Sequence, residues 1–108
     1  MITVTLFRKN GNIDKVRAYG HSGIGERGND ILCAAASAII QTAYLAVKDL
    51  GVQTEYLRDT ESGLFEFTLG NENRRDVDII LRAMVVGIQD LTSGYPQNIK
   101  LEEQSTCL

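Results

Sequence analysis

Residues 30–51 read DILCAAASAIIQTAYLAVKDLG, and this segment sets the architecture of the whole chain. An Asp directly before an apolar run is typical of a helix N-cap, because its carboxylate accepts backbone N–H groups of the first turn. Gly51 suits the position just after the helix end. The segment therefore predicts a helix from Ile31 to about Leu50. Residues 31–47 carry no charge, but they are too few and too polar for a membrane span, so we expect a buried core helix and no membrane.

Around this helix, the apolar and polar residues alternate with the period of half-buried strands. Asn10-Gly11 marks a turn between the first two strands, and residues 59–63 mark another, so the sequence predicts two hairpins. Five segments show the alternation: residues 2–8, 13–20, 52–58, 64–69 and 98–103.

A second helix is predicted by apolar residues on a spacing of three and four between Val77 and Leu91. Asn71 or Asn73 would cap it, and Gly94 would end it. The resulting order is ββαββαβ, and neither helix can bury its apolar side except against the sheet or the other helix. We therefore expect a two-layer α+β fold, with two helices packed on a mainly antiparallel sheet in a single domain over residues 1–108.

The composition narrows the classes of function. Eleven Lys and Arg stand against fourteen Asp and Glu in 108 residues, so the chain lacks the basic surface that binds phosphate backbones. Direct binding of nucleic acid is not expected. The first residues alternate like a strand and do not resemble a signal peptide, so a cytoplasmic location is expected. In a reducing compartment Cys33 and Cys107 would be separate thiols, and Cys107 reads as a tail thiol without function.

The chemistry is concentrated between Gly20 and Ser37, a segment that holds the single His, His21, and the internal Cys33. With Asp30 as N-cap, Cys33 lies in the first helical turn, where unpaired N–H groups and the helix dipole favour a thiolate. Such a site can lower a thiol pKa, although the charge of Asp30 opposes this. A glycine-rich loop between the two residues is long enough to bring imidazole to sulfur, so His21 as general base and Cys33 as nucleophile form a possible dyad.

Less specific roles for these residues remain open. A cysteine in an alanine-rich helix is more often a small core residue, and a histidine at a strand end is more often a polar turn residue. Asp30 is more often only a cap than a group that orients a catalytic histidine. Ser37, one turn beyond Cys33, could be a packing residue or could reach the active site.

Other motifs in the chain predict little. Gly23-x-Gly25-x-x-Gly28 matches a dinucleotide fingerprint, but the flanking elements are hairpins rather than parallel strands with a crossover. The chain has no P-loop lysine motif. One histidine and two distant cysteines cannot make a closed zinc site, so no metal and no cofactor are expected.

At this segment the chain resembles the ribosomal-processing cysteine protease family, Prp. The family signature is a Gly-His, a glycine-bearing loop, an Asp-Ile-Val-Cys-Ala run and then Ser-Ala. Here Leu32 replaces the valine, which changes no chemistry. The length and the ββαββαβ order extend the similarity over nearly the whole chain. The matching residues are Gly20, His21, Gly28, Asp30, Ile31, Cys33, Ala34, Ser37 and Ala38.

The resemblance implies a homodimeric cysteine protease that trims the short N-terminal extension of large-subunit ribosomal protein number twenty-seven, cutting after an aromatic pair. It assigns His21 as general base and Cys33 as nucleophile, and it implies that the loop between Gly20 and Asn29 moves when the peptide binds. The small residues after Cys33 leave room for a large apolar side chain before the cut. We expect substrate-binding or supporting roles for Gly20, Ser22, Gly28, Asp30, Ala34 and Ser37.

Two other classes of protein would use the same residues differently. A thiol redox sensor would also need an activated Cys33, although no resolving cysteine lies nearby in the sequence. A non-catalytic, ribosome-associated binding module would need neither His21 nor Cys33 for chemistry.

Overall fold

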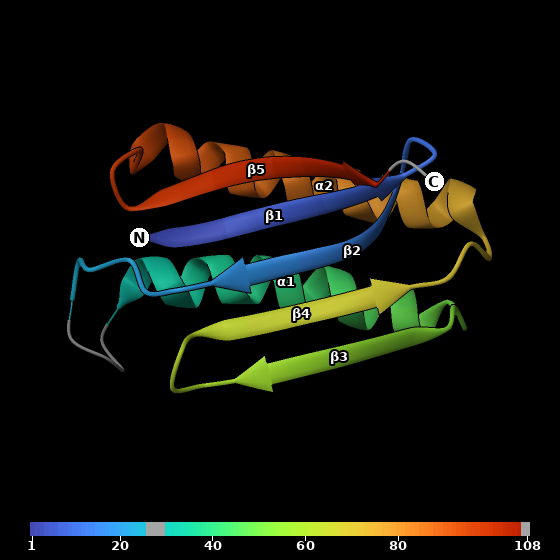
Figure 1. Cartoon of the computed structure of the whole chain (residues 1–108), viewed down its shortest axis with the longest axis horizontal. Helices are drawn as coiled ribbons and strands as arrows, with labels where there is room; N and C mark the ends of the chain where they lie inside the picture. Colours follow the sequence, from blue (N-terminus) through green and yellow to red (C-terminus); the bar gives the residue numbers. More distant parts are fainter. Residues whose placement is uncertain (26–29, 107–108) are drawn as a thin grey trace.

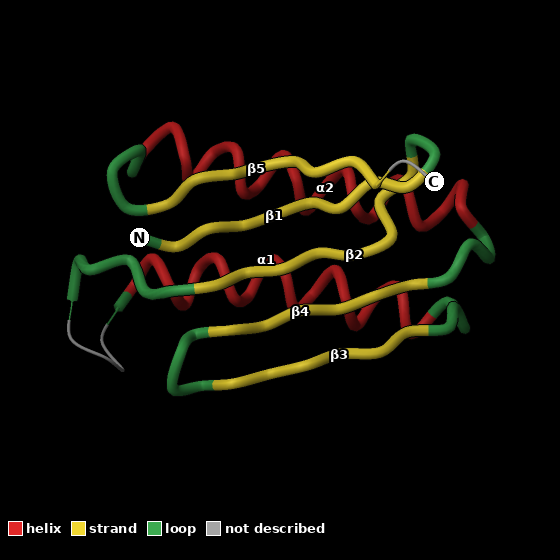
Figure 2. Tube along the Cα trace, viewed as in Figure 1, coloured by secondary structure: helices red, strands yellow, loops and turns green. Residues whose placement is uncertain are grey.

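A computed structural model of the chain describes residues 1–25 and 30–106, and its elements follow the predicted ββαββαβ order. All five strands form one sheet, and both helices lie against the same face of it (Figures 1 and 2). The elements are β1 (Ile2–Lys9), β2 (Asn12–Tyr19), α1 (Ile31–Asp49), β3 (Thr54–Asp59), β4 (Leu64–Leu69), α2 (Arg74–Gly94) and β5 (Ile99–Thr106).

The sheet has the strand order β3-β4-β2-β1-β5. The pairs β1–β2, β2–β4 and β3–β4 are antiparallel, whereas β1 and β5 are parallel. The expected mainly antiparallel sheet is thus confirmed, with one parallel pair that joins the two ends of the chain. This pair requires the crossover that α2 provides.

The core lies between the sheet and the helices. Val4 and Leu6 of β1, with Phe67 of β4, are fully buried and face the helices. Tyr44 of α1 packs on Phe67 with ring centroids 5.5 Å apart. Full burial of one such side chain stabilises the fold by about 1.5–3 kcal/mol relative to leaving it exposed.

Helix α1 satisfies by length and composition the criteria for a membrane span, which core helices of soluble proteins also satisfy. In the structure its inner side contributes to the core between sheet and helices, as expected for a core helix. The buried residues of α1 are Leu32, Ala36, Ile40, Ala43, Tyr44 and Val47.

Two local expectations need adjustment. The third strand begins at Thr54 rather than residue 52, although Val52 is buried beside the core. Asn73 holds the N-cap position of α2, but its backbone is left-handed (φ 53°) and its side chain makes no capping hydrogen bond. Asn tolerates this conformation better than most residues, so the backbone turn rather than a side-chain cap starts the helix.

Candidate active site

The first turn of α1 fixes the position of Cys33. Asp30 is the N-cap, with an extended backbone (φ −83°, ψ 99°), and its Oδ1 accepts a hydrogen bond of 3.0 Å from the Cys33 backbone N–H. The Ala34 N–H donates to the Asp30 carbonyl at 3.1 Å, which closes the first helical turn. The predicted cap is therefore confirmed, and Cys33 occupies the third helical position with its side chain partly exposed.

The second carboxylate oxygen of Asp30 holds the thiol. The Cys33 Sγ–H donates to Oδ2 at 3.0 Å. The Ser22 hydroxyl donates to the same oxygen in a short hydrogen bond, and the Ser22 backbone N–H donates at 3.2 Å. Asp30 thus joins the end of the loop after β2 to the start of α1.

Ser22 is held in place from several sides and is only 2% exposed. Its hydroxyl oxygen accepts a hydrogen bond of 3.2 Å from the Ile24 N–H. Its carbonyl accepts one of 3.0 Å from the Asn98 side chain, at the entry to β5. The sequence predicted a supporting role for Ser22 but missed Asn98, because 76 residues separate the two and no local pattern links them.

His21 lies beside the β3–β4 turn. Its Nε2 is 3.4 Å from the Glu61 carbonyl oxygen, and its own carbonyl accepts a hydrogen bond of 2.6 Å from the Met1 backbone nitrogen. A Cβ on Gly63 would come within 3.0 Å of the imidazole and even closer to the Gly20 carbonyl, so only glycine leaves room there. Gly63 was read from the sequence as a turn residue only.

Within the described residues, no hydrogen bond joins His21 to Cys33: the thiol is bonded to Asp30 and the imidazole lies on Glu61. The expected imidazole–sulfur contact is therefore absent from this arrangement. Both residues nevertheless flank the same loop, since Ser22 follows His21 directly and shares the Asp30 carboxylate with Cys33. Each side chain therefore has to leave its present partner before the two can exchange a proton.

The electrostatics of the site favour a protonated thiol. Burial raises the pKa of Cys33, and its hydrogen bond to the Asp30 carboxylate raises it further, against a smaller lowering by the Ser22 N–H. The expectation that the helix start lowers this pKa is wrong for this arrangement, because burial and the hydrogen bond to the Asp30 carboxylate both stabilise the protonated thiol.

The Asp30 carboxyl shows the opposite shift. Burial raises its pKa, but the hydrogen bonds from the Ser22 hydroxyl and from Cys33 together outweigh burial and lower the pKa from 3.8 to about 2. Asp30 is thus ionised at neutral pH and forms the charged centre of the site.

The structure describes three of the other predicted site residues. Ala34 and Ser37 are exposed on α1, with Ser37 one turn beyond Cys33. Gly20 has a left-handed backbone (φ 100°) that brings it against Met1. Gly28 lies outside the described residues, as does Cys107. Predictions for those two residues remain predictions.

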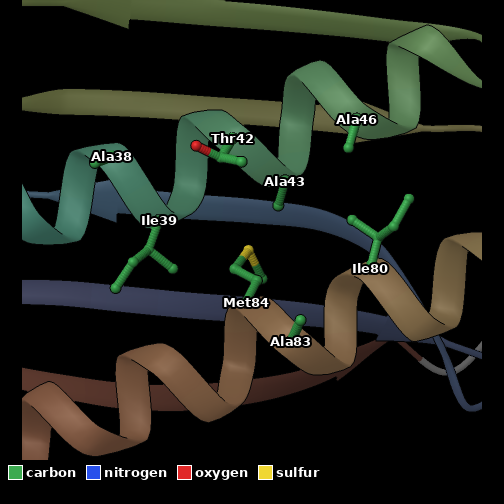
Figure 3. Close-up of a pocket in the computed structure, with 8 residues that line it drawn as sticks. All are labelled: Ala38, Ile39, Thr42, Ala43, Ala46, Ile80, Ala83 and Met84. Atoms are coloured by element: carbon green, nitrogen blue, oxygen red, sulfur yellow. The ribbon is translucent and has the colours of Figure 1, made fainter.

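A hollow of about 440 Å³ lies elsewhere, between α1 and α2 (Figure 3). Its walls are almost entirely apolar, with Ile39, Ile80 and Met84 as the larger side chains, and none of its lining residues is titratable. In the described part of the chain, no group of three or more His, Cys, Asp or Glu side chains is gathered around a possible metal position.

Comparison with known proteins identifies the family. A sequence profile of the cysteine protease Prp matches residues 1–100. The chain belongs to the Prp family of cysteine proteases. The predicted family is thus confirmed. Ribosomal processing cysteine protease Prp of Staphylococcus aureus is 32% identical over 94% of this chain and 97% of that protein. Its Bacillus subtilis counterpart is 29% identical, covering 76% and 78% of the two chains.

Solved structures show the same fold. The S. aureus Prp protease has been crystallised with a covalently linked product peptide and with a substrate peptide. The product complex matches with a TM-score of 0.87 and 31% identity, and the substrate complex with 0.83 and 30%. Each comparison covers 96% of this chain and 100% of the other.

The first prediction concerns the reactivity of the thiol. In a Cys107→Ser background, Asp30→Asn should speed the alkylation of Cys33 by iodoacetamide several-fold at pH 7.5, because it removes the charge that opposes the thiolate while Asn still caps the helix. The pH–rate profile of alkylation measures this. Asp90→Asn, an equal charge change on the exposed side of α2, is the control and should leave the profile unchanged. Equal profiles for Asp30→Asn and the parent would contradict the carboxylate's role.

The second prediction concerns acid stability. The folded pKa of Asp30 is about 2 against an ordinary 3.8, so its contribution to stability is complete above pH 4 and is lost as the pH falls toward 2. Asp30→Asn should therefore lower the free energy of unfolding at pH 5 and flatten its decline between pH 4 and 2. Urea denaturation followed by circular dichroism measures both. A decline as steep as the parent's would show that other carboxylates cause it.

Proposed function

We propose that this chain is a cytoplasmic endopeptidase that removes the short N-terminal extension of large-subunit ribosomal protein twenty-seven, with Cys33 as nucleophile and His21 as general base. The observation that carries the proposal is a partly exposed thiol at the start of α1, in a chain of the Prp cysteine protease family. The peptide complexes of the S. aureus relative support a peptide as substrate.

The chemistry starts from the resting arrangement. Substrate binding would bring the imidazole from the Glu61 carbonyl to the Cys33 sulfur and displace the thiol from Asp30. His21 then takes the thiol proton, and the thiolate attacks the scissile carbonyl carbon. As the C–N bond breaks, the imidazolium returns its proton to the leaving amine and a thioester remains. Water hydrolyses the thioester, which releases the carboxylic acid product and restores the thiol.

Because the pKa of the resting Cys33 thiol is raised, the reaction needs a step that activates the thiol. While Asp30 accepts the Sγ–H hydrogen bond, Cys33 is a weak nucleophile, so the unoccupied enzyme is protected from oxidation and alkylation. Displacing the thiol from Asp30 removes the hydrogen bond that holds the proton on sulfur, so the thiolate forms only when substrate is bound.

The properties of the Cys33 thiol also favour the protease over a redox sensor and over a non-catalytic binding module. A redox sensor would need a readily formed thiolate, whereas burial and Asp30 keep the Cys33 thiol protonated. A binding module without chemistry would not need a thiol at this position, although its peptide-binding surface could be the same.

Cleavage is the direct test. A peptide that spans the extension and its junction should be cut by the parent at a single bond, as seen by mass spectrometry. Cys33→Ala should abolish cleavage, and His21→Gln should lower kcat about 10²–10⁴-fold, the usual contribution of a general base. Ser93→Ala, an exposed hydroxyl on α2, is the control and should cut as fast as the parent. Retained cleavage in Cys33→Ala would refute the nucleophile.

The proposal includes a homodimer, because the resemblance to the family implies one. Sedimentation velocity at micromolar concentration should give twice the mass of one chain. A single-chain mass under the conditions in which the enzyme is active would contradict the dimer while leaving the chemistry intact.

A further inference from the structure

A second feature of α1 lies on the same side of the helix as the thiol. Residues at spacings of three and four share a helix face, and Cys33 is followed on its face by Ser37, Gln41, Tyr44 and Lys48. The last three of these line a hollow of about 250 Å³ between α1 and β3. The hollow is therefore aligned with Cys33 along the helix.

The opposite wall of this hollow comes from the β3–β4 hairpin. Tyr56 of β3 stacks near Tyr44, with ring centroids 5.5 Å apart, and Phe65 of β4 lies 5.8 Å from Tyr44. Arg58 lies over the Phe65 ring at 5.5 Å. The aromatic groove, defined by Tyr44, Tyr56, Arg58 and Phe65, thus has a floor of rings and a cationic rim.

The exposure of the groove is unusual for an aromatic cluster. Tyr56 is 61% exposed and Leu45, on the rim, is 59% exposed, whereas Tyr44 and Phe65 are 8% exposed. Exposed apolar side chains around buried rings form a surface on which another apolar side chain loses its contact with water. The groove therefore fits an apolar or aromatic side chain from outside the chain.

The hairpin connects the aromatic groove to the site around His21. β3 runs from Thr54 to Asp59, and the turn that follows it holds Glu61 and Gly63 against His21. α1 begins at the same end of the molecule as this turn (Figure 1). Cys33 and the turn that contacts His21 thus lie at one end of the molecule, and the aromatic groove lies further along α1 and β3.

β3 is also an edge strand. It pairs with β4 on one side only, and after Thr54 its residues are exposed. Its free N–H and C=O groups can accept an extended peptide as an added strand, which is a recurring way of binding peptides. A peptide in that position would run along the length of β3, whose Asp59 end leads into the turn that contacts His21.

The separation of Cys33 and Tyr44 along α1 indicates which part of the peptide would reach the groove. Tyr44 lies eleven residues after Cys33, which corresponds to about 16 Å at 1.5 Å per helical residue. An extended peptide covers about 3.3 Å per residue, so the groove is about five residues from the scissile bond.

We propose that the aromatic groove is a remote specificity site that binds an apolar side chain of the substrate about five residues from the scissile bond, with the peptide extended along the free edge of β3. The proposal rests on the proposed protease function. It assigns Tyr56 as a substrate-contacting residue, because this ring is exposed at the groove and lies on the edge strand.

The test combines a variant with a change in peptide length. Peptides with six residues on both sides of the cut are compared with peptides shortened to three residues on one side or on the other. For the parent, shortening on the side that occupies the groove should lower kcat/KM about tenfold, mainly through KM. Tyr56→Ala should lose about tenfold on the long peptide and nothing on that short one. Leu57→Ala, the exposed neighbour on the other face of β3, should match the parent.

Two outcomes would overturn the proposal: equal losses for Tyr56→Ala on long and short peptides, which a purely structural role would produce, or no loss on either.

If the parent cleaves none of the peptides, the proposed function fails, and the groove is tested by peptide binding instead. Fluorescence anisotropy of the labelled long and short peptides with the Cys33→Ala protein should then show tighter binding of the long peptide that Tyr56→Ala removes. No such difference would overturn the groove as well.

Discussion

The Asp30 carboxylate connects the fold of this protein to its chemistry. One oxygen caps α1 through the Cys33 N–H, and the other accepts the Cys33 thiol and the Ser22 hydroxyl. A single ionised group thus starts the helix, fixes the loop after β2 and, together with burial, keeps the Cys33 thiol protonated. Since the same charge stabilises the folded state and disfavours the thiolate, stability and resting reactivity are coupled at this residue.

The sequence predicted those parts of the structure that depend on neighbours along the chain. The alternation of apolar and polar residues predicted the strands, and the spacing of three and four between apolar residues predicted α2. The Asp before an apolar run predicted the N-cap of α1. These signals are local, because each element buries one side of its own residues. The parallel pairing of β1 with β5 was not specified, since it joins residues about a hundred positions apart.

The geometry of the site was harder to predict for the same reason. The composition of the loop allowed His21 to reach Cys33, but the resting place of the imidazole depends on Met1, Glu61 and Gly63, which come from two other parts of the chain. The position of the Cys33 proton depends on whether Asp30 or His21 is nearer to sulfur. A spacing of twelve residues cannot distinguish these arrangements. In the structure, it is Asp30 that accepts the hydrogen bond from the Cys33 thiol.

The parallel pair β1–β5 has a consequence for folding. Asn98, at the entry to β5, donates to the Ser22 carbonyl and accepts from the Ile2 N–H, so the last strand holds the loop that carries the site. Contacts between such distant residues form late in folding because closing so long a loop costs entropy. A chain in which β5 has yet to pair with β1 keeps the Ser22 hydrogen bonds to Asp30 but lacks the one from Asn98, so the loop gains this last anchor only when the sheet is complete.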